Sequence, residues 1–148
     1  MGTRSTIAIQ NEDGTVTGIY CHWDGYTSYN GRILKEFYTD EAKVRELIAL
    51  GDLSSLGAQI GEKHPFSERV DAETYAETRC TAYGRDRGEK DVEAATHRSW
   101  TELLEAFGQQ YDYLFVPGAG WTVRYFAGWD NAVESLAEAI LSEAAQEA

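Results

Sequence analysis

The sequence predicts an α+β fold, in which an antiparallel sheet built from hairpins carries three to four packed helices. Segments of strand character occur in pairs around turn residues, and segments with helical spacing of apolar residues lie between those pairs. This alternation of hairpins and helices is typical of α+β proteins. With 148 residues, 43% of them hydrophobic, and no linker-like stretch, the chain is expected to fold as a single globular domain over residues 1–148.

The first hairpin is predicted from Thr3–Gln10 and Thr15–Trp23, which are joined by Asn-Glu-Asp-Gly. If Asp13 and Gly14 form a two-residue turn, His22 and Asp24 share one face of the sheet and Trp23 points to the other. The facing pairs are then Ala8 with Ile19, Ser5 with His22, and Arg4 with Trp23. This pairing makes Arg4 a candidate ligand-binding residue beside His22, Trp23 and Asp24. A turn one residue longer or shorter would reverse these assignments.

Two helices are expected next. Tyr29–Tyr38 has its apolar residues on one stripe, and Thr39 or Asp40 can cap a second helix that ends at Gly51. Leu53 and Leu56 are then expected to pack back from a loop or short turn.

The middle of the chain is less regular. Gly57–Asp71 is polar and lacks periodicity, which predicts a loop, and Tyr75–Tyr83 is predicted as a strand. That strand is expected to lead into a glycine-bounded turn at Gly84–Glu89.

The last third predicts a helix, a hairpin and a final helix. Ser99 followed by Glu102 forms a capping box for a helix that ends near Gly108. Tyr111–Val116 and Trp121–Phe126 form the second hairpin. A closing helix is predicted from about Asn131, with apolar positions at Val133, Leu136, Ile140 and Ala144.

The formal net charge of −12 argues against nucleic-acid binding, which depends on Lys and Arg to neutralise phosphates. No apolar run approaches the 18 residues of a membrane span, so no membrane contact is expected. The carboxylates either form a solvating surface or imitate phosphates in order to occupy a basic groove on another protein. The proposed acidic surface near the end of the chain consists of Asp130, Glu134, Glu138, Glu143 and Glu147.

The stretch Ile19–Tyr26 is the most unusual in the chain because polar and aromatic residues crowd the expected end of a strand. His22 and Asp24 could supply a general base, a pair of metal ligands, or a simple ion pair at the strand end. Neither a metal site nor a cofactor is predicted, because no nucleotide-binding or metalloenzyme motif occurs. Trp23 and Tyr26 could line a stacking pocket, form a protein interface or fill the core, and these alternatives stay open.

Gly84–Glu89 offers a second candidate ligand site. Arg85 and Arg87 could form a fork for a phosphate or a carboxylate. Alternatively, Asp86 and Glu89 pair with these arginines in a solvated turn.

Cys21 and Cys80 lie in strand-like segments and are expected to be buried, reduced thiols, as is typical of cytosolic proteins. A disulfide between them is left open. The first residues lack the apolar core of a signal peptide, which agrees with a cytoplasmic location.

The motifs Thr3-Arg4-Ser5-x-Ile7-Ala8-Ile9, Asp13-Gly14, Ile19–Tyr26 and Tyr83–Glu89 together resemble a family of small, uncharacterised proteins encoded by phages and prophages. The resemblance runs from the N-terminus to about Ser55, resumes at Tyr83–Glu89 and is weak in the last third. It implies an accessory protein of a mobile element, acting in a bacterial cytoplasm, and it transfers no established reaction.

From the acidic charge and this context, the sequence favours a non-enzymatic binding protein that counters host defence, like an anti-CRISPR protein. Its partner would be a host defence protein with a basic surface. The first alternative is an oligomeric sponge that sequesters a nucleotide immune signal through the arginines and aromatic rings. The second is a small hydrolase that uses His22 and Asp24. Self-association is left open.

Overall fold

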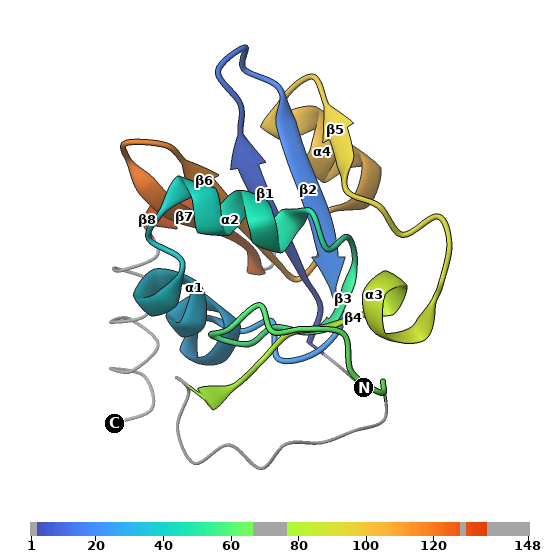
Figure 1. Ribbon diagram of the computed structural model, residues 1–148. Coiled ribbons are helices and arrows are strands. Elements are labelled where there is room, and N and C mark those ends of the chain that lie inside the picture. The colour runs from blue at the N-terminus through green and yellow to red at the C-terminus, as the bar shows by residue number, and fades with distance from the viewer. Residues whose placement is uncertain (1–2, 67–76, 128–129, 136–148) are drawn as a thin grey trace.

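The computed structural model describes residues 3–66, 77–127 and 130–135, and within them eight strands form one sheet with helices on both faces (Figure 1). The strands are β1 (Ser5–Gln10), β2 (Val16–Cys21), β3 (Leu53–Ser55), β4 (Thr81–Ala82), β5 (Ala95–His97), β6 (Tyr111–Val116), β7 (Gly120–Ala127) and β8 (Asp130–Ser135). The helices are the π-helix η1 (Thr27–Gly31) and the α-helices α1 (Arg32–Phe37), α2 (Glu41–Ile48), α3 (Tyr83–Arg87) and α4 (Trp100–Phe107). The predicted α+β class is confirmed.

The sheet is mostly antiparallel, but it is mixed rather than purely antiparallel. Its order is β4-β3-β2-β1-β6-β7-β8, and β5 also pairs with β2. The pairs β1–β6 and β2–β3 are parallel. The strand that pairs with the second edge of β1 is β6, which follows β1 only after more than half of the chain. A pairing between strands so far apart has no local sequence signal.

The first hairpin forms, but its register differs by one residue from the predicted one. Ala8 lies opposite Gly18, not Ile19. Three residues lie between Asn11 and Thr15, and the Asn11 amide donates a hydrogen bond of 2.8 Å to the Thr15 carbonyl. Gly14 takes a left-handed φ of 87°, as such a turn requires. Ser5 therefore lies opposite Cys21, and the predicted facing of Ser5 with His22 and of Arg4 with Trp23 is wrong.

Both predicted helix caps are confirmed. The Asp40 side chain accepts a hydrogen bond from the Ala42 amide at the start of α2. Gly51 follows α2 with φ of 78°, a conformation that suits glycine. Ser99 accepts from the Glu102 amide at the start of α4, which ends before Gly108.

Three other expectations are corrected. The predicted loop position of Leu53 is instead the start of strand β3. Of the predicted strand Tyr75–Tyr83, only β4 belongs to the sheet in the described part, with an isolated bridge at Arg79. Gly84–Glu89 is not a turn, because most of it belongs to α3, which ends at left-handed Gly88.

The helix predicted from Asn131 is also replaced. Its first residues form β8, which pairs antiparallel with β7. The edge of β7 offers backbone hydrogen bonds to the segment that directly follows it, and these bonds override a weak helical pattern. The rest of the predicted helix lies outside the described residues.

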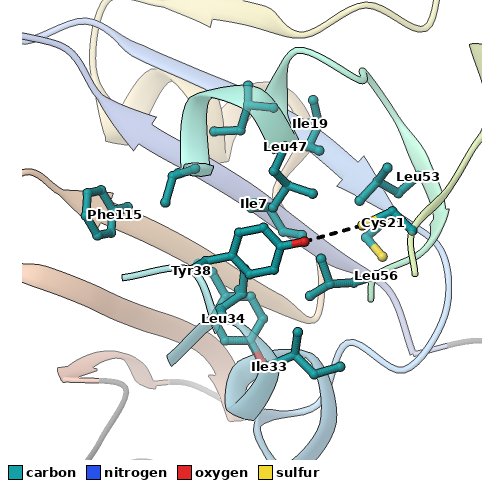
Figure 2. Packing of buried hydrophobic residues seen from close by; sticks show 14 of the residues in the cluster. Ile7, Ile19, Cys21, Ile33, Leu34, Tyr38, Leu47, Leu53, Leu56 and Phe115 are labelled. Atoms are coloured by element: carbon teal, nitrogen blue, oxygen red, sulfur yellow. Dashed lines mark hydrogen bonds between the residues drawn. The ribbon is translucent and has the colours of Figure 1, made fainter. Parts of the chain in front are cut away.

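One face of the sheet packs against α1 and α2 in the larger hydrophobic core (Figures 1 and 2). Figure 2 shows Tyr38 at its centre, among Ile7, Leu34 and Leu47. The Tyr38 hydroxyl donates to the Gly57 carbonyl at 2.6 Å, so this large buried ring leaves no polar group unsatisfied.

The opposite face is covered by α4 over only part of its length. Leu103 of α4 packs with Ala8, Val16 and Leu114 near the hairpin end of β1 and β2. Because side chains alternate along a strand, Tyr20 shares this face with Val16 but lies at the other end of β2, beyond that cluster. The helices of the described residues are all too short or too polar to cross a bilayer.

Candidate functional site

Trp23 is the large hydrophobic residue that stands exposed in the described part of the chain, with 43% of its surface accessible. It follows the end of β2, yet its backbone is held firmly. Its amide donates to the Ser54 carbonyl at 3.1 Å, and its carbonyl accepts from the Asn30 side-chain amide at 3.0 Å. An exposed indole on a fixed backbone is suited to contact another molecule at little entropic cost.

The backbone after Trp23 adopts a tight and partly strained course. Asp24 has a left-handed φ of 57°, which is uncommon for a residue other than glycine. Gly25 lies so close to β1 that a Cβ there would be 2.7 Å from the Thr3 carbonyl oxygen. Such strain persists only where surrounding contacts enforce it, and it is frequent at functional sites.

The π-helix η1 completes this loop and supplies its central anchor. Asn30 is fully buried; its amide nitrogen contacts the carbonyl of Trp23 at 3.0 Å and the thiol of Cys21 at 3.5 Å. Its own backbone amide donates to the Asp24 carbonyl at 3.2 Å. Asn30 thus holds Trp23 through its side chain and Asp24 through its backbone amide.

On the second sheet face, beyond the cluster under α4, Tyr20 and His22 form a close pair. The Tyr20 hydroxyl lies 2.6 Å from Nδ1 of His22, and the His22 ring meets the Trp23 ring edge-on at 4.6 Å between centroids. Burial raises the pKa of Tyr20, and the positive charge of Arg4 opposes that rise, which places Arg4 near the hydroxyl.

A second group of rings continues the surface from Tyr20. Tyr83 is close enough to Tyr20 to perturb its hydroxyl, and it hydrogen-bonds Ser54, the residue whose carbonyl holds Trp23. Phe66 stacks on Tyr83 with centroids 5.6 Å apart, and the Arg87 guanidinium lies 4.6 Å from the Phe66 ring. We call the five rings of Tyr20, His22, Trp23, Phe66 and Tyr83 the aromatic patch.

Arg85 and Asp86 have an internal role. Arg85 donates to the carbonyls of Ile60 and Cys80, each at 2.8 Å, and to both carboxylate oxygens of Asp86. Asp86, whose side chain is fully buried, also accepts from the amides of Ala82 and His64. Burial alone would raise the pKa of Asp86, but the guanidinium and these amides outweigh it, so the pKa is lowered.

The sequence-predicted candidates are therefore divided between these roles. His22, Trp23 and Arg4 come together at the aromatic patch, whereas Arg85 and Asp86 tie α3 to the preceding loop. Arg87 joins the patch from α3, and its guanidinium also contacts Glu89 at 2.6 Å. A two-arginine fork would require Arg85 to give up its internal acceptors.

His22 and Asp24 are not joined by a hydrogen bond in the described structure. His22 pairs with Tyr20, and Asp24 accepts from the Tyr26 hydroxyl at 3.3 Å. Because Asp24 has left the extended conformation, the strand alternation that would have placed the two side chains on one face ends before it.

Several patch residues were missed by sequence reasoning. Tyr20 could have been found, since it lies two positions before His22 and shares its face. Phe66 and Tyr83 reach the patch only through the folding of distant segments, for which the sequence carries no signal.

Cys21 and Cys80 are buried free thiols, and burial raises the pKa of Cys21 to about 12. The described residues contain no group of three His, Cys, Asp or Glu side chains that could hold a metal ion. In the proposed acidic surface, Asp130 and Glu134 lie on β8, whose side chains are not described. Its other members, Glu138, Glu143 and Glu147, lie outside the described residues.

Comparison of the chain with protein-family models, with curated proteins and with solved structures finds no match.

Proposed function

We propose that the chain is a non-enzymatic binding protein, which inhibits a bacterial defence protein by covering a basic surface on it. The exposure of Trp23 on a fixed backbone carries this proposal. Interfaces concentrate their binding energy in a few aromatic and arginine anchors, and Trp is prominent among them.

The surroundings of Trp23 support a protein partner. The aromatic patch combines rings with hydroxyl and imidazole groups, and Arg87 is stacked at its border. Aromatic rings and arginine are enriched in this way at the centres of protein interfaces. The net charge of −12 would attract a basic partner and accelerate the encounter.

The phage context and the cytoplasmic site of action rest on the motifs Thr3–Ile9, Ile19–Tyr26 and Tyr83–Glu89. The acidic surface near the end of the chain is proposed as a second part of the contact. Capture of a nucleotide signal is less favoured, because Arg85 has internal acceptors for its guanidinium. A hydrolase with His22 and Asp24 is less favoured, because the imidazole is paired with Tyr20.

The test is a phage-plating experiment on bacterial strains that each carry one defence system. We expect the chain to restore plaques on a strain whose defence protein it inhibits. Trp23→Ala should abolish the restoration, while Lys35→Ala, at an exposed position on α1, should preserve it. Full restoration by Trp23→Ala would refute the proposed contact surface.

A further inference from the structure

We propose that Arg4 and His22 form a subsite for a single carboxylate of the partner protein, next to the anchor Trp23. This inference rests on the proposed function and names the chemistry that the partner must place against the aromatic patch.

Arg4 is exposed and its guanidinium forms no ion pair or hydrogen bond within the part of the chain that the structure describes. The protein has 25 acidic residues, and most of the described arginines have a carboxylate partner. Carboxylates pair with Arg32, Arg45, Arg85, Arg87, Arg98 and Arg124. An arginine left without one beside aromatic side chains is available to a group from another molecule.

The sheet register places Arg4 beside His22. Ser5 lies opposite Cys21 in the β1–β2 pair, and the Gly25 amide donates to the Thr3 carbonyl at 2.7 Å. The segments before β1 and after β2 therefore stay side by side beyond the paired residues. Arg4 therefore continues the face that Tyr20 and His22 occupy, which α4 leaves open.

The Tyr20–His22 hydrogen bond occupies Nδ1 of His22 and leaves Nε2 for another group. Burial favours the protonated hydroxyl of Tyr20, which can donate to Nδ1 of His22. A neutral imidazole that accepts at Nδ1 carries its proton on Nε2. Nε2–H of His22 and the guanidinium of Arg4 then provide two donors on one face for the oxygens of one anion.

A carboxylate fits the charge of the whole molecule better than a phosphate does. The net charge of −12 repels polyanions, whereas it attracts a basic protein that carries one isolated carboxylate at its contact. Such a carboxylate would add little affinity at long range, but it would fix how the partner is oriented on Trp23.

The test uses the full chain, labelled with nitrogen-15, and a blocked peptide of four lysines, one leucine and one glutamate. Nuclear magnetic resonance follows the indole N–H of Trp23 and the ring nitrogens of His22. We expect saturable shifts with this peptide, and binding about tenfold weaker or more with the same peptide carrying glutamine in place of glutamate. Arg4→Gln should weaken binding of the glutamate peptide about tenfold or more.

Arg32→Gln is the matched control, because it changes the net charge equally but removes an exposed pair with Glu36 on α1. It should leave the shifts unchanged. Equal binding of the glutamine peptide, or equal binding by Arg4→Gln, would overturn the proposal. Saturable shifts with inorganic phosphate but not with the peptide would also overturn it and would point to a phosphate ligand. If Trp23→Ala alone loses the partner and Arg4→Gln keeps it, the proposed function stands and only the carboxylate subsite fails.

Discussion

Individual residues in the loop after β2 decide where the candidate site lies. Trp23 is exposed at a position where Asp24 leaves the extended conformation and the Asn30 side chain donates to the Trp23 carbonyl. The sequence indicates this position as unusual, but not its geometry. A left-handed φ is a conformation that aspartate adopts more readily than most residues, whereas the burial of Asn30 depends on contacts from the rest of the fold.

Gly25 is predicted to be required for that geometry. A Cβ in Gly25→Ala would be 2.7 Å from the Thr3 carbonyl oxygen and 2.9 Å from the Arg4 carbonyl carbon, so the loop must move away from β1. We expect a loss of about 1–3 kcal/mol in the free energy of unfolding, measured by urea denaturation.

Gly84→Ala is its control. Gly84 is helical, and its added Cβ would make an ordinary contact of 3.4 Å with Val92. This variant should be as stable as the parent or slightly more stable. Equal stability of the two variants would contradict the close approach at Gly25.

Asp86 is predicted to stabilise the fold in a pH-dependent way. Because its pKa is lowered in the folded state, its stabilisation is present above the unfolded pKa near 3.8 and is lost as the pH falls through the folded value. Asp86→Asn leaves Arg85 without its carboxylate and should cost about 3 kcal/mol at neutral pH. Urea denaturation should show that this cost shrinks as the pH falls below 3.8. A cost independent of pH would contradict the role of the charge.

At the scale of elements, helix ends and hairpins could be predicted, and the pairing of distant strands could not. Asp40 and Ser99 cap their helices as local chemistry requires. The register of the first hairpin depended on whether Gly14 closes a two-residue or a three-residue turn, and the sequence Asp-Gly permits both. The short strands β3, β4 and β5 form because they pair with neighbouring strands, and their own sequences have little strand propensity.

Asp52 shows how the sheet joins two of these short strands. The outer edge of β2 pairs with β5 near Val16 and with β3 at Cys21, and between them the carboxylate of Asp52 accepts from the Tyr20 amide at 3.0 Å. Burial raises the pKa of Asp52, so its ionised form is disfavoured in the fold.

Two substitutions of Asp52 are therefore predicted to differ. Asp52→Ala leaves the Tyr20 amide without its acceptor and should cost about 1–3 kcal/mol. Asp52→Asn retains a carbonyl acceptor and removes the charge, so at neutral pH it should be at least as stable as the parent. That advantage should disappear as acid protonates Asp52 in the parent, which pH-dependent urea denaturation measures. Equal destabilisation by both substitutions would contradict this role.

At the scale of the whole molecule, one sheet brings together segments that the sequence keeps far apart. Helices α1 and α2 cover one face, and α4 covers part of the other (Figure 1). The part that α4 leaves open carries Tyr20 and His22, and α3 brings Tyr83 to its border. The α+β class was therefore predictable, but the aromatic patch was only half predictable, because Phe66 and Tyr83 arrive through tertiary folding.

The most direct test of the central claim is native mass spectrometry of the protein purified from bacteria with an active defence system. We predict a complex with a basic host protein that Trp23→Ala loses and Lys35→Ala retains. Both variants should unfold at the same urea concentration as the parent, since both positions are exposed. A small molecule released on denaturation, or a host protein bound equally by Trp23→Ala, would contradict a protein-binding surface centred on Trp23.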